Sequence, residues 1–233
     1  MSQFKFSAGP WNVHEGADAF GPPIRQDISI ESKMVRYKEI GFDAMQFHDD
    51  DAVPNINDLN EDEIKSAARR VKKKLDNTGL AAEFVAPRLW MDPRTADGGY
   101  TSNSAEDRAF ALWRSLRSID IARELGCDKI VLWLAREGTL CAESKDAVES
   151  IKRLIEAIDQ MLAYDRTIKI LIEPKPNEPI DRSFCGTLGH VMSVSAATAD
   201  PSRVGGLLES AHAILARLDP ANALAFGLAL GKL

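Results

Sequence analysis

Residues 168–179 read IKILIEPKPNEP, an apolar run followed by a segment with three prolines. The apolar half, residues 168–172, has the length and β-branched composition of a buried strand. The prolines exclude a helix and stiffen the backbone that follows. Because alternate residues of an extended segment share a face, Glu173 and Lys175 project to one side where the strand ends. An exposed, salt-bridged loop is the alternative, but the other motifs favour a strand of a parallel α/β sheet that presents catalytic groups.

The rest of the chain alternates short apolar runs with amphipathic helices. Expected strands cover residues 5–7, 42–48, 81–87, 129–135, 168–174 and 204–210. Expected helices cover residues 29–40, 61–77, 105–125, 145–163, 187–197 and 220–231. Such alternation requires a parallel sheet with right-handed crossovers. No linker or low-complexity tract divides the chain, so we expect a single domain over residues 1–233.

Composition restricts the class of protein. The chain has 233 residues, of which 45% are hydrophobic and 27% charged, as in a soluble globular domain. A net charge of −6 with 29 Lys and Arg argues against nucleic acid or an anionic membrane as partner. The N-terminus lacks the apolar core of a signal peptide and no apolar run is long enough to span a bilayer, so we expect a cytoplasmic protein. Cys127, Cys141 and Cys185 lack the CxxC spacing of zinc and redox sites, so we expect them to be reduced and structural.

The connections between the expected elements differ in length. Long, Pro/Gly-rich stretches follow four of the strands, at residues 9–27, 49–60, 87–103 and 174–186. Connections from a helix back to the next strand are short. Loops that follow strands lie at the carboxyl end of a parallel sheet, so we expect the functional site at that end.

Two polar pairs fall at this end of the sheet. His48 ends the second strand and Asp51 follows three residues later, so the carboxylate can orient one ring nitrogen, as a general acid/base needs. A histidine in a turn beside solvated acids is an equally good interpretation of that pair alone. Glu209 and His212 follow the sixth strand and can both reach one ion. Their spacing also occurs often by chance.

Aromatic side chains follow several of the same strands. Trp11 and Phe20 lie in the loop after the first strand, Trp90 follows the third and Trp133 belongs to the fourth. Apolar walls around charged groups exclude water and stack on the C–H faces of a small polyol. Core packing is the usual role of tryptophan, and we assign Trp113, in the middle of an expected helix, to that role.

These residues together resemble the sugar isomerase branch of the TIM-barrel enzymes, specifically xylose isomerase of the short, bacterial kind. The matching features run in order through nearly the whole chain: residues 10–11, 47–51, 97–100, 133, 136–138, 172–179, 189–190 and 209–212. The run EPKPNEP is highly specific. The resemblance implies an α/β, TIM-barrel-like fold with about six β/α units and a small sugar as substrate.

The resemblance also implies a divalent metal cofactor. The glutamate matching Glu173 binds the first of two ions, the one matching Glu209 bridges both ions, and the histidine matching His212 binds the second. Carboxylates suit hard ions, and a single imidazole is compatible with Mn²⁺ or Co²⁺. We expect Mg²⁺, with Mn²⁺ or Co²⁺ as alternatives.

Catalytic and substrate-binding roles follow from the same resemblance. The histidine matching His48, held by the acid matching Asp51, assists opening of the cyclic sugar, and the lysine matching Lys175 polarises the substrate carbonyl. The tryptophans matching Trp11 and Trp133 form the pocket walls. The phenylalanine matching Phe20 enters the site of a neighbouring subunit. A homo-oligomer, a dimer or a tetramer, is therefore expected.

The chain departs from the family pattern in two places. Relatives continue past residues 231–233 into two further strands that supply the remaining aspartate ligands, so we expect an incomplete barrel and a weak or missing second metal site. At the exit of the third strand, Ala86, Pro87 and Arg88 replace small polar residues, which puts the sugar preference in doubt. An incomplete barrel has two open edges, and we expect the segment 220–233, in which residues 223–230 carry no charge, to be buried in oligomer contacts.

Three functions are compatible with these observations. The first is a metal-dependent aldose-ketose isomerase that interconverts D-xylose and D-xylulose, or D-glucose and D-fructose, with low activity where ligands are missing. The second is a non-catalytic sugar- or metal-binding remnant of the family, and the third is a sugar epimerase. We favour the isomerase, because a remnant has no reason to retain the acid/base pair, the lysine and the aromatic residues together.

Overall fold

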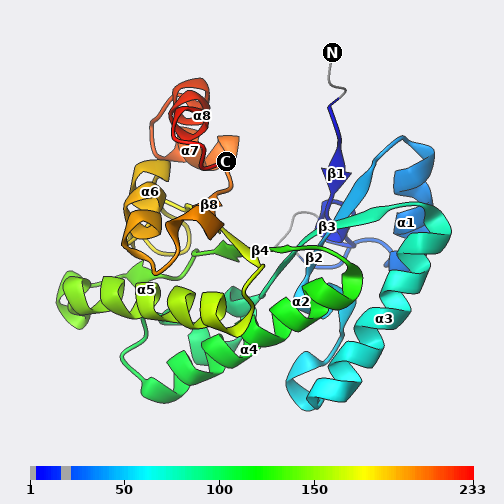
Figure 1. Ribbon diagram of the computed structural model, residues 1–233, viewed down its shortest axis with the longest axis horizontal. Coiled ribbons are helices and arrows are strands. Elements are labelled where there is room, and N and C mark those ends of the chain that lie inside the picture. The colour runs from blue at the N-terminus through cyan, green and yellow to red at the C-terminus, as the bar shows by residue number, and fades with distance from the viewer. Residues whose placement is uncertain (1–3, 17–21) are drawn as a thin grey trace. The chain divides into compact units, whose positions relative to one another are not determined.

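A computed structural model describes residues 4–16 and 22–233. Its main sheet has six strands in the order β1-β2-β3-β4-β6-β8, and the pairs β1–β2, β4–β6 and β6–β8 are parallel (Figure 1). The strands are β1 Ser7–Ala8, β2 Ala44–His48, β3 Ala81–Ala86, β4 Lys129–Trp133, β6 Lys169–Glu173 and β8 Val204–Gly206. The predicted α/β class, the six strands and the open, TIM-barrel-like sheet are confirmed.

The six predicted helices are also present. They are α1 Ile30–Glu39, α3 Glu61–Thr78, α4 Ala105–Leu125, α5 Ala147–Tyr164, α6 Leu188–Ala197 and α8 Pro220–Ala229. The Asn60 side chain accepts a hydrogen bond from the backbone N–H of Glu63, whose carboxylate accepts one from the backbone N–H of Asn60. This capping box starts α3, and Gly79 ends the helix in the left-handed conformation at φ 72°.

Several predicted bounds differ from the structure, and two of the differences bear on the site. The sixth strand stops at Gly206, not at residue 210, and the chain then turns into α7 (Ser210–Leu215). The loop expected after β2 begins with a short helix, α2 (Asp49–Ala52). Three consecutive acidic residues at its start favour this turn, because their charges stabilise the N-terminal end of a helix.

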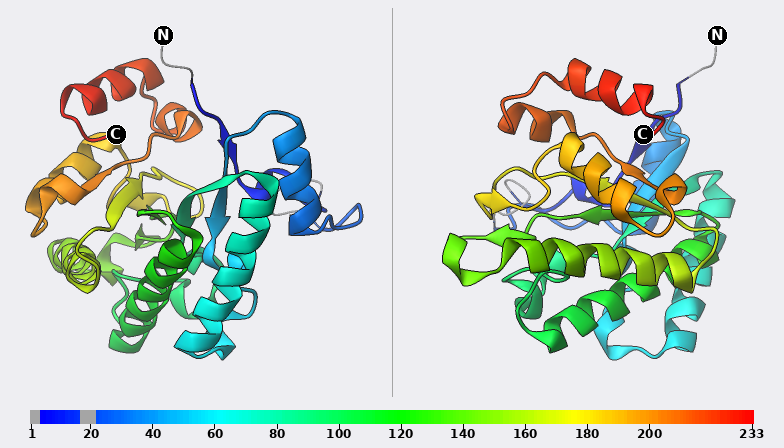
Figure 2. Two further views of the ribbon diagram at one scale, coloured as in Figure 1. Left: turned by 45° about the vertical axis from the view of Figure 1, so that its right-hand side comes forward. Right: turned by 60° about the vertical axis from the view of Figure 1, so that its left-hand side comes forward.

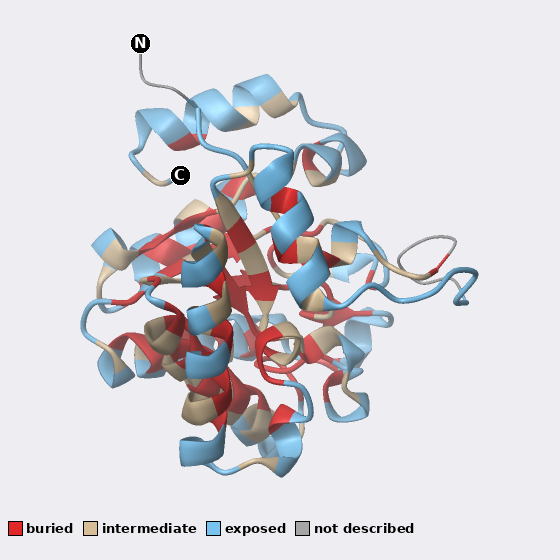
Figure 3. Ribbon diagram, turned by 90° about the vertical axis from the view of Figure 1, so that its right-hand side faces the viewer, coloured by how far each residue is buried: buried red, intermediate tan, exposed pale blue. Residues whose placement is uncertain are grey.

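The chain divides into two compact units, while the single domain over 1–233 stays a prediction. The first unit comprises Met1–Val85 and Arg117–Asp128, and the second comprises Ala86–Leu116 and Lys129–Leu233. Each unit has buried residues of its own, and Figure 3 colours the buried residues of the chain red. In the first these include Met34, Met45, Phe47, Ile64 and Leu75; in the second they include Ile130, Leu132, Leu154, Ile170 and Ile172.

The second unit carries a small two-stranded sheet that was not predicted. β5 (Gly138–Thr139) pairs antiparallel with β7 (Arg182–Ser183). This sheet joins the loop that follows β4 to the loop that follows β6. Gly138 permits this approach, because a Cβ atom there would lie 2.4 Å from the Arg182 carbonyl oxygen.

The C-terminal segment covers part of the β8 edge within the same chain. The backbone N–H of Gly206 donates to the carbonyl of Lys232 at 2.7 Å, and Lys232 Nζ reaches Ser195 Oγ at 3.1 Å. Helix α8 packs against α7 and lies on the outside of the unit (Figure 2). Phe226 and Leu228 of α8 are 54% and 63% exposed, so the chain does not bury this apolar helix itself.

No helix in the described part of the chain has the length and apolar character needed to cross a membrane.

Candidate functional site

Three of the predicted polar site residues lie close together in the second unit. The parallel register places Glu173, the last residue of β6, opposite Trp133, the last residue of β4. His212 lies in α7, and its Nδ1 atom is 3.3 Å from Glu173 Oε1. Lys175 is buried, and its Nζ lies 3.8 Å from Glu178 Oε2.

The electrostatics of this cluster favour a bound cation. Burial and, to a smaller extent, the negative charge of Glu209 raise the pKa of Glu173, the ammonium of Lys175 lowers it, and the net result is a pKa of about 7. Burial lowers the pKa of His212, and the Lys175 ammonium acts in the same direction. Two carboxylates that repel each other beside a neutral imidazole form a cluster in which a positive ion would relieve unfavourable charge.

The donor atoms fit the divalent metal that the sequence implied. His212 Nδ1 is a buried polar atom without a hydrogen-bond partner. With the carboxylate oxygens of Glu173 it offers the mixed oxygen and nitrogen set that Mg²⁺, Mn²⁺ and Co²⁺ accept. Glu209 takes another position: its Oε1 accepts a hydrogen bond from the N–H of Ala211 at 3.0 Å and caps α7. The three predicted ligands do not all approach within 4.8 Å of one another.

Two of the predicted aromatic residues contact this cluster. The rings of Trp90 and Trp133 meet edge to face, with centroids 4.5 Å apart and planes at 90°. Trp133 also lies over His212, with centroids 6.3 Å apart and planes at 17°. The indole N–H of Trp133 is buried without a hydrogen-bond partner. The second unit thus brings a carboxylate, an imidazole and an aromatic wall together.

The predicted acid/base pair is in the first unit. Asp51 Oδ2 lies 3.0 Å from His48 Nδ1 and accepts a hydrogen bond from the His48 backbone N–H at 2.9 Å. The ring of Trp11 packs on the His48 ring at a centroid distance of 4.1 Å. His48, Asp50 and Asp51 have ligand atoms within 4.8 Å of one another, so a cation is an alternative partner of this group. Of the predicted site residues, Phe20 lies outside the described part of the chain.

A polar layer beside His48 was not predicted. Gln46 Nε2 donates to Ser7 Oγ at 2.9 Å and to Glu83 Oε2 at 3.1 Å, and Ser7 Oγ also contacts Glu83 Oε2. These side chains come from β2, β1 and β3. The alternation of intermediate and buried residues along β2 puts Gln46 on the same face as His48. In the sequence, apolar Met45 and Phe47 alternate with polar Gln46 and His48, and this alternation could have predicted the layer.

Comparisons with known proteins identify the family. A family model described as xylose isomerase-like TIM barrel matches residues 35–233. The fold is similar to that of 3-keto-D-glucoside 4-epimerase from E. coli, with a TM-score of 0.63, 19% identity, and coverage of 93% of this chain and 75% of the other. It is also similar to D-psicose 3-epimerase from Clostridium cellulolyticum H10, with a TM-score of 0.67, 10% identity, and coverage of 91% of this chain.

The chain spans only 65% of the length of that second epimerase. A xylose isomerase domain protein from Alicyclobacillus acidocaldarius has a TM-score of 0.61 and 15% identity, and the match covers 92% of this chain and 66% of the other. At these identities the structural matches show the fold alone, whereas the family model covers most of the sequence. The chain therefore belongs to the xylose isomerase-like TIM-barrel family.

Proposed function

We propose that this chain is a metal-dependent aldose-ketose isomerase that interconverts D-xylose and D-xylulose, with D-glucose and D-fructose as further substrates. One observation carries the proposal: the partly buried Glu173–His212 pair lies beside Lys175 and against the Trp133 ring. This arrangement combines a cation site, a hydrogen-bond donor and an apolar wall, which are the parts that a small sugar requires.

Glu173 and His212 would hold the divalent ion, with Glu209 as a further carboxylate nearby. The bound ion supplies a Lewis acid that stabilises negative charge on the sugar oxygens. The protein supplies the orientation, because Glu173 ends a rigid strand and the proline-rich segment after it restricts the backbone.

Lys175 would donate a hydrogen bond to the carbonyl oxygen of the open-chain sugar. Its side chain is 10% exposed, and its ion-pair partner is the Glu178 carboxylate at 3.8 Å. An ammonium in such a partly dry environment interacts more strongly with developing negative charge than it would in water. Trp90 and Trp133 exclude water from the same cluster.

His48 would move the proton when the sugar ring opens. The contact between Nδ1 and Asp51 selects one tautomer of the ring. Trp11 restricts the orientation of the ring by packing against it. His48 and Asp51 therefore stay the proposed acid/base pair, together with Lys175 as the third catalytic residue.

Sugar epimerisation is the second candidate, and the pKa of Glu173 favours it specifically. In this second reaction Glu173 would be the general base and not a metal ligand, because a carboxylate with a pKa of about 7 in the metal-free chain is suited to remove a proton from carbon at neutral pH. A ketose epimerase needs a general base next to the sugar, whereas hydride transfer between C1 and C2 uses no such base.

Product analysis distinguishes the two reactions. D-Xylose and D-fructose are incubated separately with the protein and Mg²⁺, Mn²⁺ or Co²⁺, and the sugars are separated by chromatography. The isomerase predicts D-xylulose from D-xylose, loss of product with EDTA, and loss in Lys175→Ala and His48→Ala but not in His190→Ala, an exposed histidine of α6. If D-fructose gives an epimeric ketose and D-xylose gives no D-xylulose, the protein is an epimerase and not an isomerase. If sugar binds and neither product forms, the protein is a non-catalytic sugar-binding protein.

A further inference from the structure

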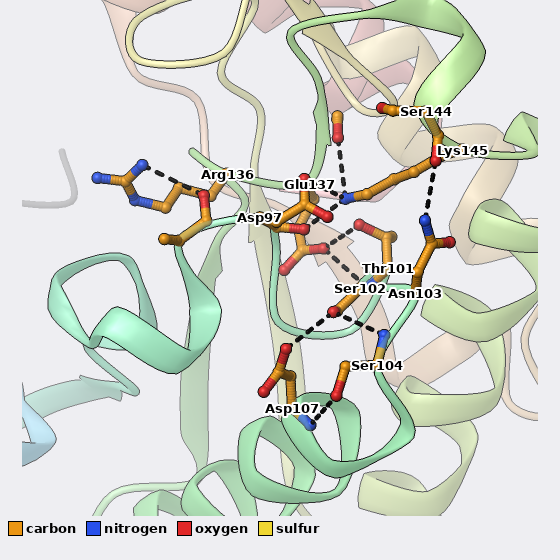
Figure 4. A network of polar contacts seen from close by, with 12 residues as sticks. Asp97, Thr101, Ser102, Asn103, Ser104, Asp107, Arg136, Glu137, Ser144 and Lys145 are labelled. Atoms are coloured by element: carbon orange, nitrogen blue, oxygen red, sulfur yellow. Dashed lines mark hydrogen bonds and ion pairs between the residues drawn. The ribbon is translucent and has the colours of Figure 1, made fainter.

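A buried carboxylate in the second unit has no role in the reaction proposed above. Glu137 is 4% exposed and follows the end of β4 (Figure 4). Its Oε1 accepts hydrogen bonds from the backbone N–H groups of Gly99 at 2.8 Å and Tyr100 at 3.1 Å. Its Oε2 accepts from the N–H of Thr101 at 2.9 Å and from Thr101 Oγ1 at 2.5 Å. The carboxylate thus satisfies three consecutive backbone donors and one hydroxyl group.

The loop sequence is adapted to this carboxylate. Gly98 has a φ of +87°, a conformation that side chains with a Cβ rarely adopt. At Gly99 an added Cβ would lie 3.0 Å from Ala111 Cβ and 3.3 Å from Glu137 Oε1. Two consecutive glycines therefore allow the backbone to close around the Glu137 side chain, as in the backbone nests that hold anions.

A buried ammonium ties the other end of the same loop. The Lys145 side chain is fully buried, and its Nζ donates to the Gly138 carbonyl at 3.1 Å and to the Asp97 carbonyl. Asp97 Oδ1 lies 3.3 Å from the same Nζ (Figure 4). Lys145 and Glu137 together fasten the loop of residues 97–101 to the backbone that follows β4.

This anchored loop is connected to the aromatic wall. Arg136, next to Glu137, donates from Nε to the Trp90 carbonyl at 2.8 Å and from NH1 to the Ala96 carbonyl at 3.4 Å. One small cavity of ≈ 10 Å³ is lined by the loop residues Gly99 and Tyr100 together with Trp90, Trp133 and Glu137. Because the loop and both rings line the same small cavity, we expect a shift of the loop to reach the Trp90 ring.

We propose that Glu137 is a positioning residue that sets the edge-to-face geometry of Trp90 and Trp133. It acts through the loop of residues 97–101 and through Arg136, and it does not touch the sugar. The proposal rests on the proposed function in one respect, since it takes the two rings to be the wall of the sugar site. A Glu137 that served stability alone would leave the ring geometry of the folded protein unchanged.

The test is the variant Glu137→Gln. Its amide keeps the size of the side chain but turns an –NH₂ group toward backbone N–H donors, so at least one buried donor loses its acceptor. The near-ultraviolet circular dichroism band of the Trp90–Trp133 pair is identified as the band that disappears in Trp90→Phe. We expect Glu137→Gln to lose the same band. We also expect KM for the sugar to rise roughly ten-fold, with kcat within about two-fold of wild type.

Two further variants keep the test decisive. Glu149→Gln removes an exposed carboxylate of α5 that pairs with Arg153, and we expect it to change neither the band nor KM. Thr101→Val removes only the hydroxyl donor, and we expect a weaker change in the same direction as Glu137→Gln. If Glu137→Gln does not fold, the band of Thr101→Val decides the question.

A folded Glu137→Gln or Thr101→Val protein with the wild-type band and KM would overturn the positioning role. The spectroscopic part does not depend on catalysis. A wild-type protein without isomerase activity would refute the proposed reaction, while the dichroism band would still report whether Glu137 positions the two rings.

Discussion

At the scale of single residues, the carboxyl group of Glu173 makes the stability of the metal-free protein depend on pH. In the folded chain its pKa is about 7, against an ordinary value of 4.5. Between these values the folded protein holds a proton that the unfolded chain releases. The contribution to stability is therefore complete below pH 4.5 and is lost as the pH rises through 7.

This titration gives the first prediction. In EDTA, the free energy of unfolding of wild type should fall between pH 4.5 and 8 by up to about 3 kcal/mol more than that of Glu173→Gln, which cannot titrate. Urea unfolding at a series of pH values measures the difference. Parallel pH profiles for the two proteins would contradict the raised pKa.

A second prediction concerns the cation itself. At pH 8 the Glu173 carboxylate is ionised and His212 is neutral, so a divalent ion at about 100 times its Kd should stabilise the fold by roughly 2.7 kcal/mol. Thermal unfolding with and without Mn²⁺ measures this shift. Glu173→Gln and His212→Leu should abolish it, whereas Asp51→Asn should retain it. An equal shift in Glu173→Gln would place the ion elsewhere, for example at His48, Asp50 and Asp51.

A third prediction concerns the ammonium of Lys175. Lys175→Met keeps the length of the side chain but removes the donor, and we expect kcat for D-xylose to fall by roughly 10²-fold or more. KM should change less, because the donor acts mainly on charge that develops during the reaction. Lys169→Met, at the exposed start of the same strand, is the matched control. An unchanged kcat in Lys175→Met would remove the lysine from the reaction.

At the scale of elements, glycine residues in β8 allow helix α6 to approach the sheet. A Cβ atom at Gly206 would lie 2.4 Å from Leu188 Cδ1 of α6, whereas one at Gly189 would meet nothing closer than Thr187 Oγ1 at 3.7 Å. Gly206 lies within β8, and Gly189 lies in the first turn of α6.

The fourth prediction uses this pair of glycines. Gly206→Ala should destabilise the protein by about 1–3 kcal/mol because the buried Leu188 side chain, or α6 with it, has to shift. Gly189→Ala should have no such cost and should stabilise by about 0.5–1 kcal/mol, since alanine favours a helix. Equilibrium unfolding in urea compares the two variants. Equal effects would show that the approach of α6 is not limited by the Gly206 position.

At the scale of the whole molecule, the exposed apolar side chains of the C-terminal helices have no partner within the described chain. They include Ile214 and Leu218 of the α7 region and Leu224, Phe226 and Leu228 of α8. Exposed apolar patches of this kind are typical of interaction surfaces. This exposure supports the proposal that the protein is a homo-oligomer whose contacts use residues 220–233.

The fifth prediction tests that oligomer. Light scattering at micromolar concentration should give the mass of a dimer or a tetramer, and Phe226→Asp with Leu228→Asp should shift it to the monomer. Leu140→Asp alters an equally exposed side chain outside α7 and α8 and should leave the mass unchanged. A stable wild-type monomer would exclude this use of the tail.

The local parts of this structure could be predicted from the sequence. Apolar periodicity and capping residues determine where α3 begins and ends, and the apolar run before the prolines determines β6 with Glu173 at its last position. The His48–Asp51 contact was also predictable, because the two residues are three positions apart. In each case the deciding interactions join residues that are close along the chain, and the signal for them is present in a short stretch of sequence.

The tertiary structure alone decided how these parts combine chemically. Neither the Glu173–His212 contact nor the Trp90–Trp133 pair follows from spacing, since each joins residues from different elements. The raised pKa of Glu173 and the burial of Glu137 could not be predicted from the sequence either. A pKa and a buried hydrogen-bond network depend on which groups surround an atom in space, and that surrounding exists only once the sheet and its loops have folded.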